Sequence, residues 1–117
     1  MLSLPSTVRV FLYTQPADMR RSFDGLAALA EAVFAENPLS GHLFAFTNRR
    51  GNRLKILWWD RGGYVIYYRR LEEGTFQLPA GESDAVEIDR TALAMILEGV
   101  DLAAERLPRY EPRVATR

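Results

Sequence analysis

The residues of this chain that are best suited to chemistry lie in one stretch, Gly41 to Arg70. It contains seven of the fifteen basic residues, and Asp60 is its only acidic residue. Aromatic side chains are interleaved with the basic ones, and positive charge beside flat rings is suited to holding nucleic acid phosphates and bases. We take the seven basic residues as candidate phosphate contacts, with Trp59 and Tyr68 as candidate contacts to a sugar or an unstacked base. The seven basic residues are Arg49, Arg50, Arg53, Lys55, Arg61, Arg69 and Arg70.

Charge is segregated along the sequence. The formal net charge is zero, but residues 71–105 contain nine acidic residues and one basic residue. A neutral protein of this kind can present a positive face to a partner. Fourteen of the fifteen basic residues are Arg, whose planar group suits phosphate and guanine, although a GC-rich genome would produce the same excess. An ordinary twisted sheet with one core face would also have this aromatic composition, so both interpretations stay open.

Two further arginines, Arg20 and Arg21, directly precede a predicted helix. Two cations beside the N-terminus of a helix can bind a phosphate together with the helix dipole. A solvent-exposed turn is the simpler interpretation of the same residues. We include both arginines among the candidate nucleic-acid contacts.

The sequence contains none of the residue patterns that support catalysis or a cofactor. Cysteine is absent and His42 is the only histidine, which excludes thiol chemistry, disulfides and the usual zinc ligand sets. Glycine-rich phosphate-binding and nucleophile motifs are also absent. Asp18, Asp24 and Asp60 could form a carboxylate metal site for phosphodiester cleavage, but each also fits a turn or the first turn of a helix. We expect no enzyme activity, no metal and no cofactor.

The length of 117 residues fits one domain with one core. No apolar run is long enough to cross a membrane, and the N-terminus has no recognisable signal peptide. The absence of cysteine fits a cytoplasmic location. We expect a single domain over residues 1–107 and a mobile, basic tail over residues 108–117. Oligomer formation is possible.

Apolar periodicity predicts an α+β fold, with a mainly antiparallel, twisted sheet of about five or six strands and two main helices. Ser22 is expected to cap the first helix, which begins at Phe23 and stops before Pro38. Asp89 is expected to cap the second, which runs from Arg90 to Glu98. The first strand could pair in either direction. The expected strands cover residues 7–14, 43–47, 53–59, 64–70, 75–78 and 85–88.

The residues Asp60 to Gly63 predict a hairpin turn in which Asp60 pairs with Gly63. This register gives the hairpin a more apolar face, which we expect to be the core face, and a more polar face that carries most of the charges and rings. The expected core face carries Leu54, Ile56, Trp58, Val65, Tyr67 and Arg69. The other face carries Arg53, Lys55, Leu57, Trp59, Tyr64, Ile66, Tyr68 and Arg70.

Residues 18–26, DMRRSFDGL, resemble the DMR-x-x-FDGL opening of the transposition accessory proteins of insertion-sequence family 66. The similarity continues through GHLF, NRR and RLKILWWD, and it ends with RRLEEGTF. It covers about residues 6–100 in the right order and spacing. The chain is thus similar to the TnpB-type product of the second reading frame of these elements. This product is distinct from the much larger RNA-guided nuclease that shares the TnpB label.

The resemblance implies a small bacterial protein that is encoded in a transposable element and acts with a separate transposase from the same element. The resemblance does not identify any DNA-binding residue, so the candidate contacts rest on charge and aromatic content alone. We expect a non-catalytic accessory protein of transposition and DNA recombination, which binds DNA at the element ends through the basic aromatic region. Two alternatives stay open: an adaptor that docks the transposase without contacting DNA, and a nuclease with a carboxylate site.

Overall fold

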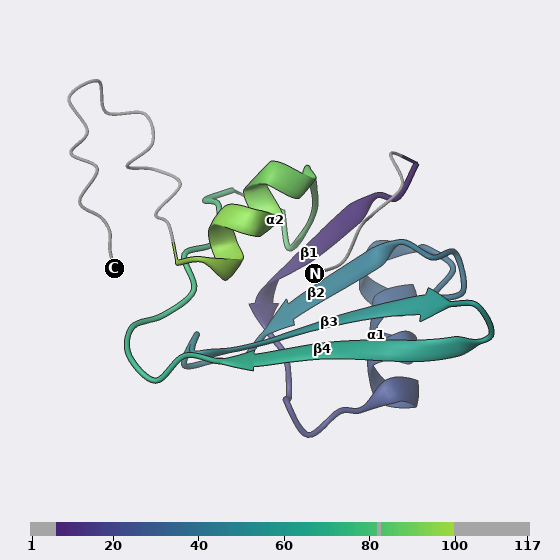
Figure 1. Ribbon diagram of the computed structural model, residues 1–117, viewed down its shortest axis with the longest axis horizontal. Coiled ribbons are helices and arrows are strands. Elements are labelled where there is room, and N and C mark those ends of the chain that lie inside the picture. The colour runs from purple at the N-terminus through teal and green to yellow at the C-terminus, as the bar shows by residue number, and fades with distance from the viewer. Residues whose placement is uncertain (1–6, 82, 100–117) are drawn as a thin grey trace.

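The computed structural model describes residues 7–81 and 83–99 of the chain. Within them lie five strands and two helices, shown in Figure 1. The expected tail over residues 108–117 lies outside the described residues. The strands are β1 (Val10–Pro16), β2 (Leu43–Thr47), β3 (Arg53–Asp60), β4 (Gly63–Arg70) and β5 (Ala85–Ile88), and the helices are α1 (Phe23–Phe34) and α2 (Arg90–Leu97).

The strands form one sheet in the order β4-β3-β2-β1-β5. β1 and β2 run parallel, with α1 as the crossover between them, and all the other neighbours are antiparallel. The β3–β4 hairpin has the predicted register, with Asp60 paired with Gly63. The predicted α+β fold with a mainly antiparallel sheet is therefore confirmed. The first strand pairs in both directions, because it lies between β2 and β5.

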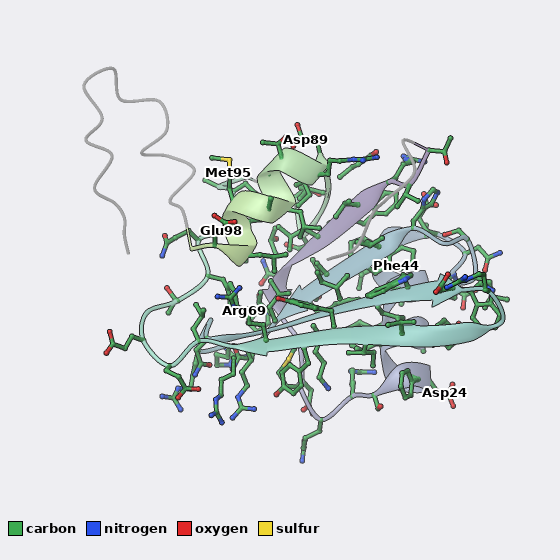
Figure 2. All side chains as sticks on the ribbon, viewed as in Figure 1. Asp24, Phe44, Arg69, Asp89, Met95 and Glu98 are labelled. Atoms are coloured by element: carbon green, nitrogen blue, oxygen red, sulfur yellow. The ribbon has the colours of Figure 1, made fainter. Side chains whose placement is uncertain are left out.

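One helix covers each face of the sheet. Alternate residues of a strand point to opposite sides, so the sheet has apolar side chains to bury on both faces. On one face, Leu26 of α1 belongs to a buried cluster with Phe44 of β2. On the other, Ile96 of α2 belongs to a buried cluster with Leu12 of β1. All five residues of β2, the central strand, are buried, and Figure 2 shows Phe44 at the sheet. The more polar hairpin face is thus a second core face, because α1 lies on it and buries Leu57.

Three local details differ from the prediction. Residues 75–78 form no strand, because Phe76 is buried and its N–H donates to the carbonyl of Gly51 at 2.8 Å, which ties this segment to the β2–β3 turn. The first strand covers Val10–Pro16 instead of residues 7–14, because its pairing with β2 begins at Val10. Ser22 occupies the N-cap position of α1, but its side chain makes no capping hydrogen bond.

Polar contacts hold the start of β1 between its two neighbours. The guanidinium of Arg9 donates to the carboxylate of Glu87 in β5 at 2.8 and 3.0 Å, and this bond lowers the pKa of Glu87. The backbone N–H of Arg9 donates to Nδ1 of His42, just before β2, at 3.0 Å. The predicted cap of α2 is confirmed, because the Asp89 carboxylate accepts from the N–H of Ala92 at 2.8 Å. Neither α1 nor α2 is long and apolar enough to cross a membrane.

Candidate nucleic-acid interface

An open groove of about 490 Å³ lies at the end of the sheet where β3 begins and β4 ends. Three segments line it: the loop Ala17 to Arg20 after β1, the turn residues Asn48 to Arg50 between β2 and β3, and the pair Arg53 and Tyr68 on the facing strands β3 and β4. Figure 2 shows several nitrogen-tipped side chains at this end of the sheet, on the side away from α2. The lining contains four guanidinium groups and one carboxylate. We call it the basic groove.

The β2–β3 turn presents Arg49 and Arg50 to solvent. Asn48 shapes this turn, because its side-chain oxygen accepts from the backbone N–H of Arg53 at 3.0 Å. Gly51 closes the turn with a φ of +76°, a conformation that favours glycine. Within residues 7–81 and 83–99, neither Arg49 nor Arg50 has a hydrogen-bond or ion-pair partner. Since no described residue occupies them, both guanidinium groups are available to bind an anion.

Arg53 and Tyr68 form a fixed pair in the groove wall. Nη1 of Arg53 donates to the hydroxyl oxygen of Tyr68 at 2.6 Å. Arg53 is half-buried, whereas Tyr68 is 46% exposed. Their position follows from the hairpin register, in which Arg53 lies opposite Arg70 and Lys55 lies opposite Tyr68, all on the α1 side of the sheet. The groove thus offers a ring with an exposed surface beside an oriented guanidinium group.

Lys55 does not line the basic groove, although it was a candidate phosphate contact. It is only 7% exposed, and its Nζ donates to the backbone carbonyls of Met19 and Arg21, each at 2.8 Å. The ammonium also lies 4.7 Å from the centre of the Tyr68 ring. A buried ammonium with these partners directs its charge to the loop after β1 and not to solvent. Lys55 is therefore a structural residue that holds this loop against β3.

The single carboxylate among the lining residues belongs to Asp18, and it is paired with Arg20. The Arg20 side chain donates to it through Nε at 3.1 Å and Nη2 at 2.8 Å, and the Arg20 backbone N–H donates at 2.9 Å. These hydrogen bonds lower the pKa of Asp18 to about 2 and raise the pKa of Arg20. Because the two charges cancel, the excess positive charge of the groove comes from Arg49, Arg50 and Arg53.

Arg61 and Trp59 lie at the opposite end of the hairpin from the basic groove. The eight residues of β3 separate the two ends by about 23 Å, from the rise per residue of a strand. Arg61 sits at the hairpin tip, with Nε 3.2 Å from the carboxylate of Asp60. The half-buried ring of Trp59 meets the ring of Tyr64 edge-on at 5.0 Å, and burial raises the pKa of Tyr64. Neither of these two candidates lines the basic groove, and the charge of Arg61 is shared with Asp60.

The remaining candidates differ in the side of the sheet on which they lie. Arg69 projects from the α2 side, as Figure 2 shows. Arg70 lies on the α1 side at the end of β4, where its Nε donates to Glu72 at 2.8 Å. Arg21 donates to the carbonyl of Gly25 at the start of α1, at 3.2 Å. Arg70 and Arg21 can therefore act only at the margin of the basic groove, and Arg69 acts on the opposite face.

Two residues that build the groove were not among the sequence candidates. Asn48 is absent from the candidate contacts, although its side chain accepts a hydrogen bond from Arg53 across the β2–β3 connection. Asp18 was recognised as a turn residue and as a possible metal ligand. In the described part of the chain, no three His, Asp or Glu side chains are placed to hold a metal ion, and Asp60 is paired with Arg61. The guanidinium groups of the groove can bind an anion, and its one ring can stack against a planar group.

A family model described as "IS66 Orf2 like protein" matches residues 8–106, which include the whole basic groove. The chain belongs to the IS66 Orf2-like family. Two proteins of Sinorhizobium fredii (strain NBRC 101917 / NGR234) are similar to this IS66 Orf2-like protein along most of its length. Uncharacterized protein y4hO is 39% identical over 101 residues, which are 86% of this chain and 88% of the relative. Uncharacterized protein y4jC is 31% identical over 94 residues, which are 80% of each chain. No solved structure matches the chain.

The IS66 Orf2-like proteins are accessory proteins of insertion sequences and not a known enzyme class. Membership confirms the resemblance found in the sequence, and it indicates association with the transposase of the element. The match extends over β1 to α2, so it covers every described element of this IS66 Orf2-like protein.

Proposed function

We propose that this IS66 Orf2-like protein is a non-catalytic accessory factor that binds the DNA of its insertion sequence through the basic groove. The observation that supports this proposal is the gathering of Arg20, Arg49, Arg50 and Arg53 around one open groove whose single carboxylate is already paired. Guanidinium groups bind phosphate oxygens and release counterions, which gives affinity for DNA of any sequence. The exposed part of the Tyr68 ring lies beside them, where a sugar or an unstacked base would contact it.

The proposed contact set is smaller than the sequence suggested. Arg49 and Arg50 would make the principal phosphate contacts because they are exposed at the tip of a turn, and Arg53 would add a third from the groove wall. Arg20 and Arg70 would contribute at the margin, where each must share its charge with a carboxylate. Three to four neutralised phosphates correspond to a log–log salt dependence of about −3 to −4.

A salt series of fluorescence anisotropy titrations with duplex DNA from the element end tests the proposal. We expect R49E/R50E to bind more weakly and to reduce the magnitude of the salt slope by about 1.8, because each lost phosphate contact accounts for about 0.9. The matched control is R61E/R69E, which changes the formal charge equally at two positions outside the groove. Its salt slope should stay close to that of the wild type.

Two results would contradict DNA binding by the basic groove. One is an equal loss of affinity in R49E/R50E and R61E/R69E, which would indicate a response to net charge alone. The other is binding by the wild type no tighter than that of a neutral protein at low salt. If the wild type shows no DNA binding and R49E/R50E still co-purifies with the transposase, the adaptor function would be supported instead.

A further inference from the structure

β4 is an open edge of the sheet, as Figure 1 shows. In the described part of the chain its only strand partner is β3, and the register is regular from Arg53–Arg70 to Asp60–Gly63. Proline, a bulge or a charge in the middle of the strand usually protects such an edge, and the eight residues of β4 contain none of these. The other edge strand, β5, is only four residues long. β4 is therefore the longer template for an added strand.

Two aromatic side chains of the β4 edge strand are exposed. Tyr67 is 37% exposed and Tyr68 is 46% exposed, and they point to opposite faces of the sheet. Tyr68 is bonded to Arg53 in the basic groove, whereas Tyr67 has no hydrogen-bond or ring partner among the residues that the structure describes. Main-chain pairing at an open edge, with side chains flanking it, is a recurrent mode of protein association.

We propose that a second copy of this chain pairs with β4 in the antiparallel direction, about a two-fold axis at Tyr67. The pairing would join two five-stranded sheets into one continuous sheet. Each β4 edge would then be covered by the other, so the dimer would expose no long edge. This inference goes beyond the proposed DNA-binding function and does not depend on it.

The charges of β4 favour the antiparallel direction. Arg69 and Arg70 are its only charged residues, and both lie at its C-terminal end. Parallel pairing would place them beside the same arginines of the second copy, and like charges that face each other across strands are destabilising. With an antiparallel axis at Tyr67, Arg70 of one copy lies opposite Tyr64 of the other, because each is three residues from the axis. A guanidinium beside a ring is a favourable neighbour.

The segments just beyond the two ends of β4 are also complementary in charge. Arg61 lies at the hairpin tip before β4, and Glu72 and Glu73 follow its last residue. Arg61 lies in the hairpin turn and Glu73 in a bend, so neither continues the strand, but antiparallel pairing brings the hairpin tip of each copy to the end of the other copy's β4, where Glu72 and Glu73 lie. All three side chains are exposed, and Glu73 has no ion-pair partner within residues 7–81 and 83–99. Opposite charges near both ends of the paired strands would thus support the antiparallel direction.

Sedimentation velocity of the full-length protein without DNA, from micromolar to several hundred micromolar, tests this inference. We expect the wild type to form a dimer at the upper end of this range. Tyr67→Lys and Tyr67→Glu would each place two like charges at the axis, so each should weaken the dimer by about tenfold or more. An equimolar mixture of the two variants should restore the dimer, because opposite charges then meet at the axis.

Leu39→Lys is the matched control, because Leu39 is also exposed (49%) but lies outside the sheet, and this variant should dimerise like the wild type. Circular dichroism and urea unfolding of each variant show whether it is folded. A wild type that is monomeric over the whole range would overturn the proposal. So would Tyr67→Lys that dimerises like the wild type, or folded Lys and Glu variants whose mixture stays monomeric. None of these outcomes bears on DNA binding, which is measured separately with R49E/R50E.

Discussion

The buried ammonium of Lys55 makes the sharpest prediction about stability. Lys55→Met keeps the length and the apolar stem of the side chain but removes the two 2.8 Å hydrogen bonds to the carbonyls of Met19 and Arg21. A hydrogen bond to a charged group contributes about 1.5–3 kcal/mol net, and part of this is offset because a buried charge no longer has to be desolvated. We therefore expect a loss of about 3 kcal/mol in the free energy of unfolding. For a domain of this size that loss corresponds to a fall in Tm of about 12 °C.

Urea unfolding followed by Trp58 and Trp59 fluorescence measures this loss. Amide hydrogen exchange adds a local measurement, since residues 17–21 should exchange faster when the lysine no longer holds them. Arg69→Met is the control, because Arg69 is an exposed cation on the neighbouring strand with no partner in the described chain, and it should change stability by less than about 0.5 kcal/mol. A loss below about 0.5 kcal/mol for Lys55→Met, with unchanged exchange in residues 17–21, would refute the structural role of this ammonium.

Two further predictions concern acid stability and helix capping. Hydrogen bonds from Arg20 lower the pKa of Asp18 to about 2, so its ionised form stabilises the fold above about pH 4, and this contribution is lost as the pH falls toward 2. Asp18→Asn should flatten the dependence of unfolding free energy on pH between 4 and 2, and an unchanged slope would contradict the pairing. Asp89→Ala removes the bond from the N–H of Ala92 and should cost about 1 kcal/mol in urea unfolding. Ser22→Ala should cost clearly less, because Ser22 makes no such bond; equal costs would count against the capping argument.

Local patterns were sufficient to predict most of the secondary structure. The 3.6-residue spacing of apolar residues located α1 and α2, and short runs of strand-forming residues bounded by turn residues located β2 to β5. The Asp60–Gly63 turn defined the hairpin register, because a two-residue loop leaves only one pairing of the flanking strands. Residues 75–78 also alternate in character, but no neighbouring strand was available to them, so the same pattern did not produce a strand there. A β-strand forms only where a neighbouring strand can pair with it, and the local sequence pattern does not show whether such a neighbour exists.

The candidate site was predictable only in part. Arg49 and Arg50 were recognised from composition as candidate contacts and lie in the groove, as does Arg20 from a segment some thirty residues earlier. The parallel pairing of β1 and β2 brings these two segments together, because each segment follows the C-terminal end of one of these neighbouring strands. No spacing in the sequence reports this pairing. The exclusion of Lys55 has the same origin, because the carbonyls that surround its ammonium belong to the loop after β1.

The sequence by itself determined the class of the fold, the positions of its two helices in the chain and the family to which the chain belongs. These depend on which residues are apolar and in what order, and a chain carries that information along its length. Only the tertiary structure decided which cations share a surface. A strand sends neighbouring side chains to opposite faces, so Arg69 and Arg70 diverge although they are adjacent. Folding also brings distant segments into contact, so Arg20 and Arg50 meet at one groove although thirty residues separate them.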